Sequence, residues 1–194
     1  SSFAEELEDF LSHLSSEQLA IHLIGGLTWR ETRLRPTGFT SRTLAPDDFV
    51  IPPLPNHLFT RDTSCWIGQG VTINPMHWKA RQNETLNFGA IYRFHPMFEK
   101  ARFDIWYDGS NFADELPSIE GGDVLVLNKD TVAIGLSERT TAPAIEALAK
   151  QLFRLKAKKQ IIAIEIPKQR SSMHLDTVMT MLDHHTFCLG IDLE

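Results

Sequence analysis

Carboxylates, arginines and histidines gather in four short polar clusters that interrupt an otherwise structural pattern. These side chains can transfer protons, bind a cation through carboxylates, or bind an anion through arginines. In one cluster His174 and Asp176 would lie on the same face of a strand, because side chains alternate, and that suits a metal site or an oriented base. The clusters are Pro55–Asp62, Ile119–Asp123, Gly135–Thr140 and Met173–Asp176.

Each cluster has an ordinary structural explanation when it is taken alone. Asp62 can simply cap a turn, and the acids of Glu120–Asp123 can be solvated turn residues. The neighbours Glu138-Arg139 are most simply a surface ion pair, worth about 0–1 kcal/mol. His184-His185 stands at a predicted turn without a third ligand at zinc-like spacing, so we expect solvated histidines there and no metal.

Taken together, the clusters predict a site for a cation. Asp62 and Asp123 lead equivalent strands of a weak internal repeat, and Asp176 would lead a third, so we expect these acids to gather at one end of the fold. Buried carboxylates raise one another's pKa and need a cationic partner to stay ionised. A planar guanidinium pairs two-pronged with carboxylates. Arg81 and Arg139 would then hold an anionic end such as a carboxylate, and the combination fits arginine as the ligand.

The repeat that would position these acids is visible when residues 62–74 are set over residues 123–135. Each copy predicts an acidic residue, a strand, a tight polar turn and a second strand, and a third copy begins at Asp176. Asn128–Asp130 is one of the predicted hairpin turns. A helix capped by Thr141 follows, and Gln160–Ile166 is typical of a buried strand. From this pattern alone, an ordinary α+β domain with coincidental spacing is an equal alternative.

The N-terminal part of the chain is predicted to be helical. Ser2 and Glu5 have the spacing of a capping box, as do Ser15 and Gln18, and Gly25-Gly26 would end the second helix. Many prolines and polar residues follow from position 30 to position 55, which predicts a connecting segment.

Composition excludes several classes of protein. The 194 residues are 42% hydrophobic, carry a net charge of −6 and contain no long basic run, so the chain is a poor candidate for binding nucleic acid, which needs clustered Lys and Arg. No stretch approaches the roughly 20 apolar residues of a membrane span, and the first residues do not resemble a signal peptide. Two cysteines cannot form a disulfide framework, and we expect a reducing, cytoplasmic setting.

Four ordered motifs resemble those of arginine deiminases, and the resemblance extends over nearly the whole chain. It implies an α/β fold that is part of a pentein five-unit α/β propeller with ββαβ-type repeats. Residues 1–46 would be the tail of a helical insertion and residues 47–194 an incomplete propeller. The motifs are Phe59-Thr60-Arg61-Asp62, Glu120-Gly121-Gly122-Asp123, Ser137-Glu138-Arg139-Thr140 and Met173-His174-Leu175-Asp176.

The resemblance also implies a reaction and a set of roles. L-Arginine and water would give L-citrulline and ammonia through a cysteine thiouronium adduct, without metal or organic cofactor. Glu120 and His174 would be the acid–base pair, while Asp62 and Asp176 grip the guanidinium. The remaining site residues would bind the rest of the substrate: Asn56, Arg81 and Arg139 at its carboxylate end, Phe59 in the pocket wall, and Asp123 beside them. The full-length form is expected to be a homo-oligomer that binds L-arginine, and neither nucleic acid nor membrane.

The pattern of the family is incomplete in these 194 residues. Its nucleophilic cysteine belongs to a Gly-rich loop well after the His174 motif, whereas Cys65 and Cys188 lie in predicted apolar strands and are expected to be buried. We therefore expect an internal fragment that is inactive alone. One alternative is a non-catalytic arginine-binding or assembly module. Others are an amidinotransferase, a dimethylarginine hydrolase, an agmatine deiminase and, more remotely, a metal-dependent hydrolase. Arg81 and Arg139 argue against the agmatine deiminase, because agmatine has no carboxylate for them to bind.

Overall fold

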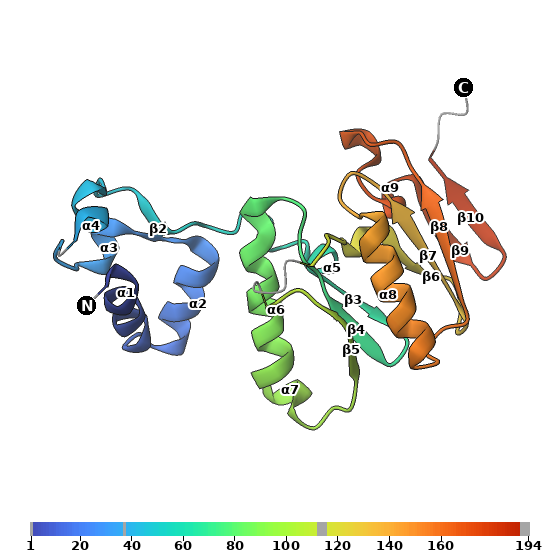
Figure 1. The fold of residues 1–194 in the computed structure, drawn as a ribbon, viewed down its shortest axis with the longest axis horizontal. Coiled ribbons are helices and arrows are strands. Elements are labelled where there is room, and N and C mark those ends of the chain that lie inside the picture. Colours follow the sequence, from blue (N-terminus) through green and yellow to red (C-terminus); the bar gives the residue numbers. More distant parts are fainter. Residues whose placement is uncertain (1, 37, 112–115, 191–194) are drawn as a thin grey trace. The chain divides into compact units, whose positions relative to one another are not determined.

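The computed structural model describes residues 2–36, 38–111 and 116–190. Contacts within the chain divide it into two compact units, Ser1–Leu58 and Phe59–Glu194, which are described separately (Figure 1).

The N-terminal unit begins with the two predicted helices. In α1 (Phe3–Ser12) and α2 (Ser16–Gly25) the predicted capping boxes are confirmed, since Ser2 pairs with Glu5 and Ser15 with Gln18. Gly26 ends α2 with a φ of 91°, a conformation that favours glycine.

The segment from position 30 to 55 is more ordered than predicted. It contains α3 (Trp29–Thr32), α4 (Phe39–Thr43) and β2 (Phe49–Ile51), and β2 pairs antiparallel with β1 (Leu27–Thr28). This pairing joins residues 49–51 to the N-terminal unit, which extends to Leu58. The expected boundary between a helical insertion and the propeller after residue 46 stays a prediction.

The second unit contains the predicted repeat as two ββαβ modules. In the first, β3 (Ser64–Ile67) pairs antiparallel with β4 (Gly70–Ile73), and β4 pairs parallel with β5 (Asp104–Asp108). In the second, β6 (Val124–Val126), β7 (Thr131–Leu136) and β8 (Gln160–Glu165) pair in the same order and sense. The two crossovers are helical: α6 (Gln82–Phe94) with the short α7 (Pro96–Glu99) in the first, and α8 (Ala142–Arg154) in the second.

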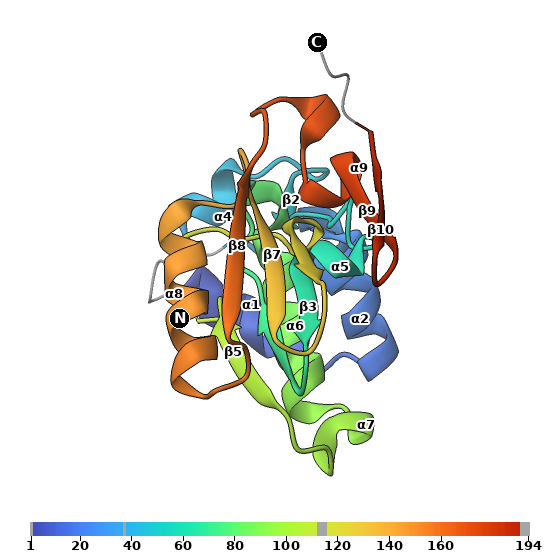
Figure 2. The same ribbon diagram turned by 90° about the vertical axis from the view of Figure 1, so that its right-hand side faces the viewer.

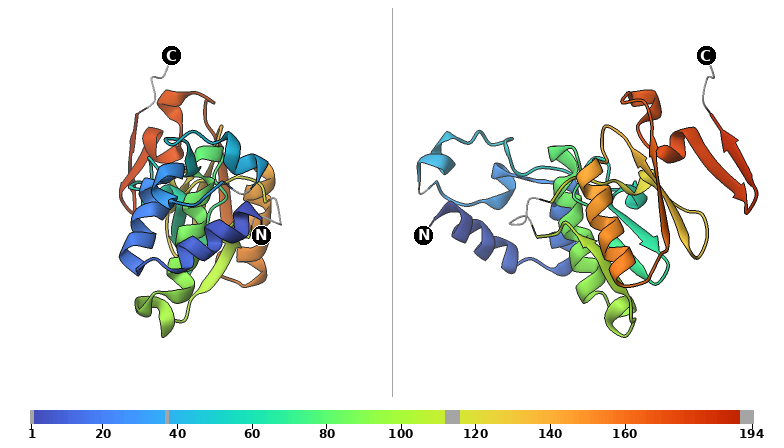
Figure 3. Two further views of the ribbon diagram at one scale, coloured as in Figure 1. Left: turned by 90° about the vertical axis from the view of Figure 1, so that its left-hand side faces the viewer. Right: turned by 45° about the vertical axis from the view of Figure 1, so that its right-hand side comes forward.

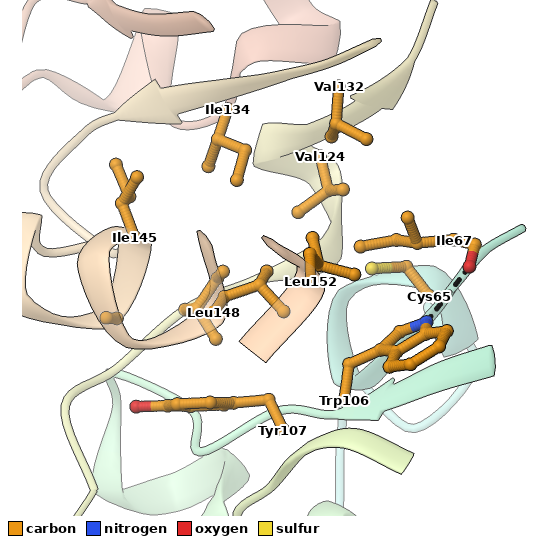
Figure 4. Close-up of a cluster of buried hydrophobic side chains, with 12 residues drawn as sticks. Cys65, Ile67, Trp106, Tyr107, Val124, Val132, Ile134, Ile145, Leu148 and Leu152 are labelled. Atoms are coloured by element: carbon orange, nitrogen blue, oxygen red, sulfur yellow. Dashed lines mark hydrogen bonds between the residues drawn. The ribbon is translucent and has the colours of Figure 1, made fainter. Parts of the chain in front are cut away.

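One apolar core joins the two modules (Figure 4). Helix α8 packs against β7 of its own sheet and against β5 of the other, so Leu148 and Leu152 share a cluster with Trp106 and Tyr107. The indole of Trp106 also donates a hydrogen bond of 2.9 Å to the carbonyl of Ile67. The two sheets are therefore held together by the helix that was predicted to follow Thr141, through its buried apolar face.

Each of the two modules, and the hairpin after the second, is preceded by a short helical turn that carries a leading aspartate. These turns are α5 (Thr60–Thr63), the 3-10 turn η3 (Gly121–Asp123) and α9 (Leu175–Val178), and α9 leads into a hairpin of β9 (Met179–Asp183) and β10 (Thr186–Leu189). Figures 2 and 3 show this hairpin as a two-stranded arm on the side of the second unit away from α8. Two further 3-10 turns, η1 (Lys79–Arg81) and η4 (Arg170–Ser172), precede α6 and α9.

Two burial predictions are wrong. Strand β8 is mostly exposed because it is the edge strand of its sheet and its outer face is only partly covered. Cys188 is exposed, as is every residue of β10, which among the described residues belongs to a sheet of two strands only. Cys65 is buried as predicted, with its Sγ 3.1 Å from Thr72 Oγ1. Within the described ranges, no helix is long and apolar enough to cross a membrane.

Candidate active site

The three leading turns converge, and the predicted acid–base residues lie where they meet. Turn η3 packs against both α5 and α9. Asp62 is on α5, Glu120 immediately precedes η3, and His174 immediately precedes α9. Residues that are 54 and more positions apart in sequence are thereby brought within contact distance.

His174 is the centre of this group. Its Nε2 lies 2.8 Å from Glu120 Oε2, and its Nδ1 lies 3.8 Å from Asp62 Oδ1. Both His174 and Glu120 are buried. The imidazole is thus oriented on one side by a hydrogen-bonded carboxylate and faces a second carboxylate on the other.

Two arginines neutralise these carboxylates. Arg139 Nη1 lies 3.3 Å from Glu120 Oε2, and the buried Nε of Arg139 has no hydrogen-bond partner among the described residues. Arg81 donates from Nη1 to Asp62 Oδ2 at 2.8 Å. Glu84, which the sequence analysis did not single out, holds the other edge of the Arg81 guanidinium with both of its oxygens.

Asp123 is drawn into the same region, but its oxygens are occupied by the chain itself. Its Oδ2 accepts from Ser137 Oγ at 2.7 Å and from Thr140 Oγ1 at 2.6 Å, while its Oδ1 accepts from the backbone N–H of Leu175 at 2.9 Å. Asp123 therefore ties the loop after β7 and the start of α9 to η3. Its predicted contact with substrate stays a prediction.

Asp176 lies at the edge of the group, and the prediction that it shares a strand face with His174 is wrong. His174 and Asp176 do not share a strand face, because the chain turns into α9 between them. The Asp176 carboxylate instead lies 3.8 Å from Arg61 Nε. Arg61 in turn donates to the carbonyls of Gly121 and Val124. A cavity of about 620 Å³ lies on this side and is lined by Arg61, Cys65 and Asp176 among others.

Burial and charge act in opposite directions on the ionisable groups. Burial disfavours the protonated form of His174, but the hydrogen bond with Glu120 and the negative charges of Asp62, Asp123 and Glu120 outweigh it and raise the pKa of His174. Burial likewise acts to raise the pKa of Glu120, but the His174 hydrogen bond and the charges of His174, Arg139 and Arg81 lower it. The two groups consequently favour an ion pair of imidazolium and carboxylate.

The aspartates that have less cationic support behave differently. Burial raises the pKa of Asp123 despite its hydroxyl donors, and burial also raises the pKa of Asp176 despite the nearby charges of His174 and Arg61. Burial raises the pKa of the Cys65 thiol as well, which disfavours its thiolate.

The group could also be considered as a metal site. Asp62, Glu120 and His174 offer ligand-type atoms within 4.8 Å of one another. However, Glu120 is already paired with His174 and Arg139, and Asp62 is paired with Arg81. A cation would have to displace these partners, so we assign none.

The remaining predicted residues lie at the boundary of the unit. Phe59 precedes α5, has an exposed ring, and accepts a hydrogen bond from Arg81 through its carbonyl. Asn56 belongs to the N-terminal unit, so its expected part in the site is untested. The expected surface pair of Glu138 with Arg139 is wrong, because Arg139 pairs with Glu120.

Comparison with known proteins identifies related sequences and folds. The family described as arginine deiminase matches residues 1–191. Among solved structures, DDAH from Pseudomonas aeruginosa, a cysteine-to-serine mutant complexed with citrulline, is 20% identical with a TM-score of 0.54, over 71% of this chain and 49% of that chain. The N-terminal domain of ArgZ, an arginine dihydrolase from cyanobacteria, was solved as a cysteine-to-serine mutant bound to substrate. It is 22% identical with a TM-score of 0.53, over 69% of this chain and 44% of that one.

These structural likenesses show the fold, a mixed α/β arrangement of small sheets that is shared with pentein-type proteins. The chain spans about half the length of the solved structures that it matches. The sheets of the described residues are open, so the five-unit propeller stays a prediction.

Proposed function

Because this chain belongs to the arginine deiminase family, we propose that it carries the substrate-binding and proton-transfer part of an enzyme that hydrolyses L-arginine to L-citrulline and ammonia. One observation carries the proposal: His174 lies between Glu120 and Asp62, at 2.8 and 3.8 Å, in a buried group flanked by arginines. This arrangement can hold a cationic carbon beside a proton donor.

The charges suit the two ends of L-arginine. Asp62 and Asp176 would accept hydrogen bonds from the guanidinium, since carboxylates match its planar set of N–H donors. The buried Arg139 Nε, which lacks a partner among the described residues, would donate to the substrate carboxylate. The family resemblance places Asn56 and Arg81 at that end too, although Arg81 is already paired with Glu84.

The proposed reaction has two stages. A cysteine thiolate attacks the guanidinium carbon, the bond from that carbon to one terminal nitrogen breaks, and His174 gives its proton so that ammonia leaves. Water then attacks the thiouronium carbon while His174 takes a proton, and cleavage of the carbon–sulfur bond releases citrulline. The raised pKa of His174 favours the protonated form that the first stage needs.

Neither cysteine of the chain is well placed to be the nucleophile. Cys65 is buried with a raised thiol pKa, and Cys188 lies on the outer hairpin strand β10. We propose that the attacking thiolate comes from outside these 194 residues, and that the chain alone binds arginine without hydrolysing it.

Two measurements test this function. Calorimetry with the 194-residue chain should detect L-arginine binding that is lost in Asp62→Asn, and that persists in Asp47→Asn, a matched change at an exposed aspartate. Citrulline should be released from L-arginine by the protein translated from the full reading frame, in the presence of a strong chelator, and not by the chain alone. Absence of arginine binding together with absence of citrulline would overturn the proposal, as would turnover of agmatine in preference to arginine.

A further inference from the structure

Glu84 is a buried carboxylate that the proposed reaction does not use. It lies on α6, is fully buried, and meets the Arg81 guanidinium with two oxygens: Oε1 is 2.9 Å from Nε and Oε2 is 2.8 Å from Nη2. Thr63 Oγ1 donates to the same Oε2 at 2.9 Å. Both carboxylate oxygens are therefore fixed by hydrogen bonds from two different elements.

This pairing determines which edge of Arg81 reaches the site. With Nε and Nη2 held by Glu84, the guanidinium meets Asp62 through Nη1, on the Oδ2 side of that carboxylate. The other oxygen, Asp62 Oδ1, is the one that lies 3.8 Å from His174 Nδ1. The orientation of Asp62 is thus linked to Glu84 through Arg81.

We propose that Glu84 is a positioning residue, which holds the Nε–Nη2 edge of Arg81 so that the Asp62 carboxylate stays turned toward His174 and keeps its negative charge for a cationic guanidine ligand. The ligand in this statement rests on the proposed function. The link from Glu84 through Arg81 to Asp62 does not, because it is present without any ligand.

The physical reason is competition for a bidentate partner. A guanidinium favours two parallel hydrogen bonds to one carboxylate over a single contact. If Glu84 loses its charge, Arg81 is free to turn and pair two-pronged with Asp62. Asp62 would then be neutralised by Arg81 and would stabilise neither a protonated His174 nor an incoming guanidinium.

The test replaces the charge and keeps the shape. Glu84→Gln is compared with Glu146→Gln, an exposed glutamate on α8. Titration of His174 by proton NMR in the ligand-free chain should give a lower pKa in Glu84→Gln than in the wild type and the control. Affinity for methylguanidinium, which has no carboxylate, should fall roughly tenfold, the effect of losing one charged hydrogen bond.

The same two measurements in an Asp62→Asn chain decide whether Glu84 acts through Asp62. If Glu84 acts through Asp62, adding Glu84→Gln to Asp62→Asn changes neither the His174 titration nor methylguanidinium binding further. A shift of equal size in both backgrounds would overturn the proposal, because the charge of Glu84 would then act on His174 directly. A Glu84→Gln chain that is only less stable, with an unchanged His174 titration, would overturn it as well.

If Glu84→Gln fails to fold, Glu84→Asp retains the charge and withdraws it by one methylene. Glu84→Asp should lower both the His174 pKa and the affinity for methylguanidinium, by smaller amounts than Glu84→Gln. A Glu84→Asp chain whose His174 pKa and methylguanidinium affinity equal those of the wild type would overturn the proposal. The other charged groups around His174, namely Glu120, Asp123, Asp176, Arg61 and Arg139, are the same in every variant. If the wild type binds neither arginine nor methylguanidinium, the proposed function fails while the His174 titration still decides the role of Glu84.

Discussion

The close approach of Gly122 to His174 gives the sharpest prediction. A Cβ atom at position 122 would lie 2.6 Å from Nδ1 and 2.7 Å from Cγ of the His174 ring. Ordinary contact begins near 3.4 Å, so Gly122→Ala must push the ring by about 0.8 Å. The ring is buried and its far nitrogen is 2.8 Å from Glu120, so it cannot move away without breaking that hydrogen bond.

The magnitude follows from the displacement. Overfilling a packed site costs about 1–3 kcal/mol of stability, and a misplacement near 1 Å in a catalytic group costs roughly 100-fold in rate. Gly122 does not adopt a left-handed backbone, since the positive-φ glycines among the described residues are Gly26 and Gly68. Contact with His174, and not backbone strain, should therefore account for the loss.

The assay is kcat/KM for citrulline release by the full-length protein, together with the histidine NMR spectrum of the 194-residue chain. Gly190→Ala is the matched control, because its added methyl would meet nothing closer than 3.7 Å. We expect the control to retain activity and the His174 signals, and Gly122→Ala to change both. An active Gly122→Ala enzyme with an undisturbed His174 signal would refute the geometry on which the acid–base assignment rests.

Three further predictions concern stability. Asp123→Ala leaves two hydroxyls and one buried N–H without their acceptor, so the free energy of unfolding in urea should fall by about 3–5 kcal/mol; a loss under 1 kcal/mol would contradict this role. The His174 pKa is raised from 6.5, so the stability that its protonation contributes is full below that value and is lost as pH rises through the raised pKa. The Glu120 pKa is lowered from 4.5, so the stability that its ionised form contributes is present above that value and is lost as pH falls through the lowered pKa. The difference in unfolding free energy between wild type and His174→Gln should therefore shrink toward alkaline pH. A difference that stays constant with pH would argue against the ion pair. Lys158→Met removes a buried ammonium that donates to the carbonyls of Asn128 and Lys129, and should destabilise the β6–β7 turn by about 1–3 kcal/mol, seen as a lower melting temperature.

The parts of the fold that were predictable from sequence are those that local chemistry determines. The Ser2 and Ser15 capping boxes, the Asn128 turn and the α8 helix depend on neighbours within a few residues, and the structure confirms each of them. The alignment of residues 62–74 over 123–135 correctly predicted two equivalent strand pairs, since β3 with β4 and β6 with β7 both pair antiparallel across a short turn.

The parts that were not predictable depend on contacts between distant segments. Glu84 was missed because its role appears only once α6 places it three residues beyond Arg81, beside Thr63. The exposure of β8 and Cys188 depends on what packs against them, and an apolar pattern does not reveal that. The resemblance paired His174 with Glu120, and the two side chains do lie together, but it did not indicate the turn into α9 that separates His174 from Asp176.

Equivalent aspartates of the two modules have different hydrogen-bond partners. Asp62 and Asp123 occupy the same position before their modules, yet Asp62 is held by a guanidinium and faces His174, whereas Asp123 is held by two hydroxyls and a backbone N–H. Burial raises the pKa of Asp123 despite its hydroxyl and amide donors. The donors around each aspartate therefore differ. Asp62 meets only Nη1 of Arg81, which leaves its Oδ1 on the His174 side. The neutral donors around Asp123 make that residue a tie between loops.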